Sequence, residues 1–313
     1  MLLFLEDVAL PEIISLGMTC RSLWSLAREI IENRYNALIA PFVGMNIKQF
    51  NLLTYSHQLL ITGSCALSMV LPWNGHQPRD LNLLVPVTGF EDVNQFLIHE
   101  LAYVRVASTP HPAVKSHVAI FEKYQKGPRF VTVASAFWDK DILEIPLASP
   151  TTAEMIVMTA GAVAIFYPDL TLQKMGLTRQ RGRGMTGTDA LGNISELGFA
   201  IQGGNDFLEG PCGKLCPSLW HTPRDISDSP LKLLTWDTRF PVRESVRTSN
   251  VEWRMEPACN NTACVNYTKR QGRSEFINSP STAREIDRQI HAIRTQKTVS
   301  GIRSLFAMNK GLG

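Results

Sequence analysis

Two apolar runs constrain this chain more than any other feature: one ends in Gly63-Ser64, and the next opens with Arg79-Asp80-Leu81-Asn82. The first run has the composition of a strand and leads into a helix-like stretch. A Gly-Ser turn between a strand and a helix leaves free backbone N–H groups, which can bind a phosphate. Asp80 and Asn82 lie two residues apart, so on a strand both side chains face the same way. The sequence therefore predicts a strand, a phosphate-binding turn, a helix and a second strand.

Alternating strand-like and helix-like runs continue on both sides of this unit. Strands are predicted at 57–62, 80–85, 103–107, 118–124 and 129–134, and helices at 64–71 and 91–101. Thr151 resembles a helix cap and precedes an apolar stretch, so a buried helix is predicted through Phe166. The uncharged run 155–168 is too short for a bilayer, which needs roughly 20 residues. The fold class expected is α+β, with an α/β core and a mixed sheet at 57–177.

The order of Gly63-Ser64, a helix and Arg79-Asp80-Leu81-Asn82 resembles the signature of the nucleotidyltransferase superfamily, whose toxin-like branches carry Gly-Gly/Ser followed by Arg-x-Asp-Leu-Asp. The resemblance covers 59–166. It implies that Asp80 and Asn82 stand at the metal-binding positions, and that Gly63, Ser64 and Arg79 hold the nucleotide. A plain strand-to-helix turn capped by Ser64 fits the same residues.

Two departures from the signature argue against catalysis. Nucleotidyl transfer uses two divalent ions held by clustered carboxylates. Asn82 offers a neutral oxygen where the second carboxylate is expected, and the run 129–136 contains Thr132 but no acid. We therefore expect a non-catalytic recognition protein on a degenerate core. The alternative is a transferase that uses Mg²⁺ and a nucleoside triphosphate to modify a protein, RNA or small molecule, with a third acid among Glu122, Asp139 and Asp141.

Helical spacing of apolar residues predicts an N-terminal helical segment at 1–44. Its stretch Cys20-Arg21-Ser22-Leu23-Trp24-Ser25-Leu26-Ala27 resembles the second half of an F-box, which commonly ends Val-Cys-Arg-x-Leu/Trp-x-x-Leu-Ala. The resemblance implies a substrate receptor whose residues 5–40 dock on the adaptor subunit of a cullin ubiquitin ligase, with an unknown protein target. The first F-box helix is missing or cut off by Met1, and Leu10-Pro11-Glu12-Ile13 only mimics its start. A helical hairpin packed on the core, with Cys20 buried, is the other interpretation.

Two cysteine pairs, Cys212 with Cys216 and Cys259 with Cys264, supply the four thiolates of a structural zinc site. They lie in a Cys/Trp-rich module predicted at 211–270, which has few core residues for its length, so a metal ion could stabilise it. His221 could replace one ligand. Two reduced thiol pairs, or disulfides in a secreted chain, are the alternatives. An F-box-like segment, a nucleotidyltransferase-like core and a Cys-containing tail together resemble an architecture of fungal proteins.

The remaining segments indicate little about chemistry. A basic, Gly-rich loop is predicted at 178–210; its run Arg179 to Gly184 is more typical of a solvated loop than of a nucleic-acid contact. An amphipathic helix is predicted at 279–308. The composition, 44% hydrophobic and 19% charged with a net charge of +3, is that of a globular protein and indicates neither nucleic acid nor membrane as a partner. Met1 to Leu5 lacks the features of a secretory signal, so we expect a cytoplasmic or nuclear protein.

Overall fold

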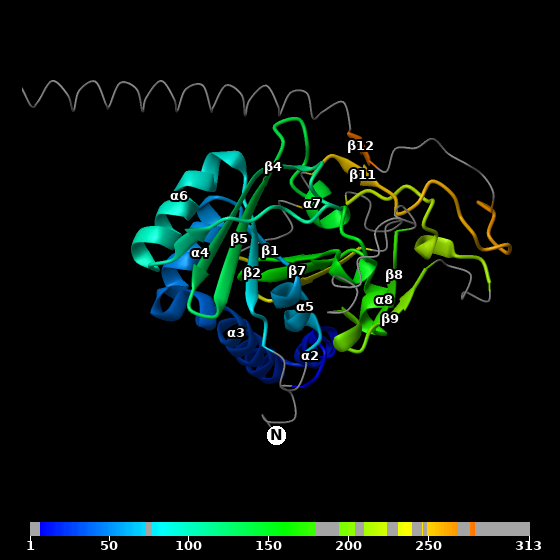
Figure 1. Ribbon diagram of the computed structural model, residues 1–313. Helices are drawn as coiled ribbons and strands as arrows, with labels where there is room; N and C mark the ends of the chain where they lie inside the picture. Colours follow the sequence, from blue (N-terminus) through cyan, green and yellow to red (C-terminus); the bar gives the residue numbers. More distant parts are fainter. Residues whose placement is uncertain are drawn as a thin grey trace, which may run out of the picture.

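The computed structural model describes residues 7–72, 77–179, 194–203, 210–223, 231–239, 246, 249–267 and 276–278. Most of the loop predicted at 178–210 and the whole helix predicted at 279–308 lie outside these residues. A mixed sheet of eight strands forms the centre of the molecule, in the order β10-β7-β6-β1-β2-β5-β4-β3 (Figure 1). The strands are β1 (Leu60–Thr62), β2 (Asp80–Leu84), β3 (Val104–Val106), β4 (Val118–Lys126), β5 (Arg129–Ala136), β6 (Ile156–Met158), β7 (Ala162–Ile165) and β10 (Lys232–Thr235). Neighbours are antiparallel except β2 and β5, which are parallel.

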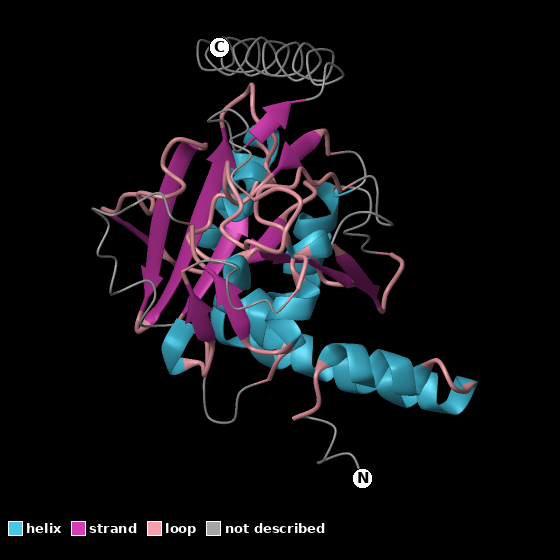
Figure 2. Cartoon of the chain, turned by 90° about the vertical axis from the view of Figure 1, so that its right-hand side faces the viewer, coloured by secondary structure: helices cyan, strands magenta, loops and turns pink. Residues whose placement is uncertain are grey.

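Helices cover the sheet and connect its strands. They are α2 (Leu10–Gly17), α3 (Arg21–Val43), α4 (Ile47–Ser56), α5 (Ser64–Val70), α6 (Phe90–Gln95), α7 (Glu144–Leu147) and α8 (Pro168–Leu172). A π-helical turn, Phe96–Glu100, extends α6. Two small sheets lie outside the main one: β8 (Met175–Leu177) with β9 (Ala200–Gln202), and β11 (Val251–Trp253) with β12 (Phe276–Asn278). Figure 2 shows the strands as one twisted layer, with the N-terminal helices near one end of it. The α+β class predicted from the sequence is confirmed.

Alternate residues along the strands build two separate cores, one on each face of the sheet. Leu81, Leu83 and Val131 belong to the core that contains α3 and α5. Leu84 and Phe166 belong to the core on the opposite face, together with residues of α7 and β11. Asp80 and Asn82 alternate with Leu81 and Leu83, so their side chains face the second side.

The N-terminal helices are part of the first core. One stripe of α3 is buried there: Ala27, Ile30, Ile31, Tyr35, Ile39, Phe42 and Val43. Arg34 ties α3 to its neighbours by donating hydrogen bonds to the carbonyls of Val8 (2.8 Å) and Met69 (3.3 Å). Gly44, with a φ of 59°, ends the helix in a conformation that favours glycine. The predicted helices are confirmed, but Cys20 is exposed, so the alternative interpretation was wrong in making Cys20 a buried hydrophobe.

The helix predicted through Phe166 is wrong, because this stretch forms the hairpin β6–β7. A 3-10 turn, Thr152–Glu154, replaces the expected helix start. β6 pairs with β1, and β7 pairs with β10. All residues of both strands are buried. A continuous apolar run is compatible with a helix or with a strand covered on both faces, and periodicity alone does not separate the two.

The sheet also extends past the core predicted at 57–177. Its edge strand β10 comes from 232–235, inside the region predicted as a small Cys/Trp-rich module. Trp236, just after β10, is buried and donates its indole N–H to the carbonyl of Ala160 at 3.1 Å. No helix in the described part of the chain is long and apolar enough to cross a membrane.

Candidate functional site

The four predicted metal ligands, Cys212, Cys216, Cys259 and Cys264, meet in one buried cluster. Their sulfur atoms all lie within 4.8 Å of one another. The Sγ–Sγ distance is 3.6 Å between Cys212 and Cys259, and 3.7 Å between Cys216 and Cys264. Tetrahedral zinc with Zn–S bonds of about 2.3 Å separates its sulfurs by about 3.8 Å, so the cluster has the dimensions of such a site. None of the four cysteines forms a disulfide, so all four are in the reduced state that metal binding requires.

Local turns bring the two sulfurs of each pair together. Cys212 and Cys216 flank the 3-10 turn Gly213–Leu215, in which Gly213 has a φ of 52°. In the second pair, the Cys264 N–H donates to the Asn261 carbonyl, and the Asn261 side chain accepts from the Ala263 N–H at 2.9 Å. Glycine and asparagine are the residues that such tight turns favour.

Polar side chains around the cluster are placed to donate hydrogen bonds to the sulfurs. Asn261 Nδ2 lies 3.4 Å from the Cys212 sulfur, and Asn266 Nδ2 lies 3.5 Å from that of Cys216. Ser218 Oγ is 3.3 Å from Cys216 Sγ. Burial and the neighbouring sulfurs raise the pKa of the Cys212 thiol to about 12, which a bound cation would reverse by stabilising the thiolate. The cluster can therefore hold a metal ion such as zinc with its coordination closed by four thiolates.

His221 does not join this cluster. Its backbone forms a two-bond bridge with that of Trp253, and its ring lies 6.0 Å from the Tyr167 ring and 5.6 Å from the Trp253 ring. Both His221 ring nitrogens, Tyr167 Oη and Trp253 Nε1 are buried, and none of these atoms has a hydrogen-bond partner among the residues that the structure describes. Burial lowers the pKa of His221 to about 4, so its imidazole is neutral near pH 7. The structure therefore contradicts the alternative in which His221 replaces one of the cysteines as a metal ligand.

The predicted turn at Gly63-Ser64 does join a strand to a helix. Gly63 separates β1 from α5 and has a φ of 72°, which favours glycine. A Cβ atom at this position would lie 2.6 Å from Asn82 Nδ2, so a larger residue would displace the Asn82 amide from its present position. Thr62 and Asn82 are register partners on β1 and β2. The turn and the Asp-x-Asn strand are therefore in direct contact, as the sequence pattern predicts.

The side chains at the expected metal position form a hydrogen bond with each other instead. Asn82 and Thr132 are register partners on the parallel strands β2 and β5, and Thr132 Oγ1 donates to Asn82 Oδ1 at 2.6 Å. Lys123 on β4 is the next register partner along this row. Burial raises the pKa of Asp80, and the charges of Lys123 and Arg79 act in the opposite direction. One carboxylate beside a hydroxyl, an amide and two cations is a poor site for divalent ions.

None of the proposed third acids can complete this site from its present contacts. Glu122 pairs with Val133, so it faces the other side of the sheet, where it forms an ion pair of 3.2 Å with Arg105. Asp141 is half-buried and accepts from the Ser249 hydroxyl at 2.7 Å and from the Leu143 N–H at 2.9 Å. Asp139 lies beyond the end of β5. Within the described residues, the cysteine cluster is the one group of three or more side chains that could hold a metal ion.

Sequence reasoning missed Lys123 and the donors around the sulfurs. The position of Lys123 could not be predicted, because it depends on the register of β4 against β5 and no local motif indicates that register. Asn261 lies between the cysteines of the second pair, so its presence in the spacer was an available signal.

Comparisons with known proteins give little beyond a partial likeness of fold. No family model matches this chain, and no curated protein sequence matches it. A solved structure described as a tRNA-processing enzyme in an apo form is similar over 51% of this chain and 45% of its own, with 14% identity and a TM-score of 0.36. A tRNA nucleotidyltransferase complexed with a primer tRNA and an ATP analogue is similar over 32% of this chain and 27% of its own, with 14% identity and a TM-score of 0.22. The chain spans less than half of each of these enzymes, and likeness at this level identifies neither activity nor substrate. The F-box and fungal resemblances stay predictions.

Proposed function

We propose that this chain is a non-catalytic, intracellular protein-recognition module, built on a degenerate nucleotidyltransferase-like core and stabilised by structural zinc. The hydrogen bond between Thr132 and Asn82 supports the non-catalytic assignment most directly. It uses the amide oxygen that stands where a metal-binding carboxylate is expected. Lys123 beside Thr132 adds a positive charge, which opposes the binding of divalent cations.

The zinc part of the proposal rests on four sulfurs that lie within 4.8 Å of one another, with polar donors around them. The zinc would be structural, because four protein ligands leave no open position for a substrate. A metal ion there would join two distant parts of the chain. The first cysteine pair ends at Cys216, and the second begins 43 positions later at Cys259.

Docking on a ubiquitin-ligase adaptor through residues 5–40 is part of the same proposal. An F-box uses an apolar helical face for this contact. In this chain the apolar stripe of α3 packs on the sheet core, so docking would use what remains exposed near Leu23, Trp24 and Leu26, all half-buried. Co-purification of the full chain with the adaptor subunit tests this part, and recovery at background level would remove the receptor role while leaving the other parts in place.

The non-catalytic assignment is tested by incubating the protein with α-³²P-labelled nucleoside triphosphates, Mg²⁺ or Mn²⁺, and protein and RNA acceptors. We expect no incorporation above that of an Asp80→Ala variant. Calorimetric titration with ATP and Mg²⁺ should likewise show no metal-dependent binding. Incorporation that is lost in Asp80→Ala would establish the alternative, a metal-dependent nucleotidyltransferase acting with Asp80.

A further inference from the structure

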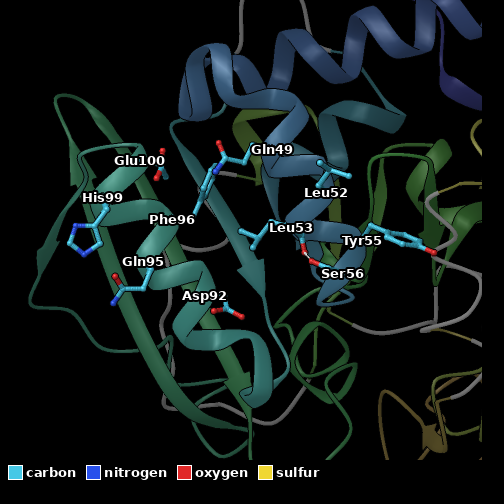
Figure 3. Close-up of a pocket in the computed structure, with 10 residues that line it drawn as sticks. All are labelled: Gln49, Leu52, Leu53, Tyr55, Ser56, Asp92, Gln95, Phe96, His99 and Glu100. Carbon is cyan, nitrogen blue, oxygen red and sulfur yellow. Dashed lines mark hydrogen bonds between the residues drawn. The ribbon is translucent and has the colours of Figure 1, made fainter. Parts of the chain in front are cut away.

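A groove with a volume of about 600 Å³ lies between α4 and the unit formed by α6 and its π-helical turn (Figure 3). It belongs to the helical layer on the first face of the sheet, away from Asp80 and Asn82. Figure 3 shows Leu53 of α4 and Phe96 of the π-helical turn pointing into the space between the two helices. Phe96 is only 5% exposed and stacks at 6.4 Å on Phe50, so the floor of the groove is apolar and fixed by the core.

The apolar surface continues onto the rim of the groove. Leu52 is 65% exposed and Tyr55 is 59% exposed, and both are large apolar or aromatic side chains. They extend the surface of Leu53 and Phe96 along α4. An exposed apolar patch with a polar border is characteristic of a protein-interaction site.

The charged border of the groove is acidic. Asp92 and Glu100 line it beside His99, and no lysine or arginine is among the described residues that line it. His57 Nε2 lies 3.2 Å from Asp92, whose side chain is nevertheless 62% exposed. A partner with positive charges beside its apolar residues therefore complements this border.

The length of the groove can accommodate a short helix. Its lining residues recur at helical spacing on both walls, from Gln49 to Ser56 on α4 and from Asp92 to Glu100 opposite. Seven residues of helix span about 10 Å, so two turns of a third helix fit along the groove. The π-helical turn Phe96–Glu100 forms part of one wall, and such turns occur frequently at functional sites.

We propose that this groove binds a basic amphipathic helix of a partner protein. Apolar side chains of that helix pack on Leu52, Leu53 and Phe96, and its lysines or arginines face Asp92 and Glu100. This mode of helix-in-groove recognition needs only the apolar stripe and the matching charges. The inference names the partner class for the proposed recognition role and rests on it.

Two synthetic 14-residue peptides test the proposal by fluorescence anisotropy with the full-length protein. Both carry leucine at helical spacing, and one has lysine where the other has glutamate. We expect the lysine peptide to bind at least tenfold more tightly. Leu52→Glu should weaken its binding at least tenfold, and the double variant Asp92→Asn/Glu100→Gln should remove most of the preference for lysine. Val104→Glu is the matched control, because Val104 is 67% exposed on β3, away from the groove, and it should change nothing.

Absence of binding, equal affinity for both peptides, or binding unaffected by Leu52→Glu would overturn the proposal. Self-association of the protein that Leu52→Glu abolishes would overturn it in favour of a second copy as the occupant. The nucleotide-incorporation assay is independent of these measurements. Incorporation of nucleotide together with intact peptide binding would refute only the non-catalytic assignment. Absence of incorporation together with absence of peptide binding would refute only the groove proposal.

Discussion

Thr132 donates a 2.6 Å hydrogen bond to Asn82 across the parallel pair of β2 and β5. Both side chains stand on the face of the sheet where metal-binding carboxylates are expected, next to Asp80. In this position the amide oxygen is already paired, and neither residue carries a negative charge. The local chemistry is that of a satisfied polar pair within a sheet.

Introducing carboxylates at these two positions should create a site for divalent cations. We expect the double variant Asn82→Asp/Thr132→Asp to bind Mn²⁺ at least tenfold more tightly than the wild type, because three carboxylates then cluster with Asp80. Isothermal titration calorimetry measures the difference. Gln125→Asp, which adds a carboxylate on the exposed part of β4, is the control and should leave Mn²⁺ binding unchanged. An unchanged affinity in the double variant would show that the geometry does not suit a metal ion.

Gly63→Ala should destabilise the protein more than an alanine at another glycine with positive φ. The new methyl group would lie 2.6 Å from Asn82 Nδ2, in addition to the backbone strain at a φ of 72°. Gly127→Ala is the matched control, since its φ is 56° and a Cβ there meets nothing within 4 Å. Strain alone costs about 1 to 3 kcal/mol, and the contact with Asn82 should add at least about 1 kcal/mol in Gly63→Ala. Urea unfolding measures both, and equal losses would contradict the close approach.

Metal removal should unfold the region around the cysteine cluster first. We expect one zinc ion per chain by elemental analysis, and a lower melting temperature after chelation. A ligand present at 1,000 times its dissociation constant stabilises the folded state by about 4 kcal/mol. Cys212→Ser should reproduce the loss, whereas Cys20→Ser, at an exposed cysteine outside the cluster, should not. A folded protein without zinc, equally stable with and without chelator, would rule out the metal site.

Acid should destabilise the protein through His221. Burial lowers the pKa of this histidine from 6.5 to about 4, so the unfolded state binds a proton more readily. This histidine therefore leaves the free energy of unfolding unchanged above pH 6.5, and it lowers that free energy as the pH falls from 6.5 towards 4. The loss amounts to roughly 3 kcal/mol. His221→Phe should remove this part of the pH dependence in denaturant unfolding at pH 7 and pH 4.5, and an identical dependence in both proteins would contradict it.

The parts of the fold that the sequence predicts are those decided within a few residues. Gly63 and Ser64 mark their turn because a positive φ excludes most other residues, and the cysteine pairs are recognisable because each pair is held by one short turn. The hairpin β6–β7 was missed because its strand character comes from pairing with β1 and β10, which are distant in sequence. The position of Lys123 depends in the same way on the register of β4. The groove beside α4 was also beyond prediction, since it arises from how two helices pack.

The two cysteine pairs bracket β10 in the chain, and this has a consequence for how the protein is made. Cys216 precedes the strand and Cys259 follows it, so the ion-binding site closes only after the edge strand has left the ribosome. Until then β7 presents an unpaired edge, and exposed edges of this kind invite pairing with other chains. Binding of the ion would then stabilise the pairing of β10 with β7. We expect newly synthesised chains starved of zinc to aggregate through this edge, whereas mature protein is protected from it.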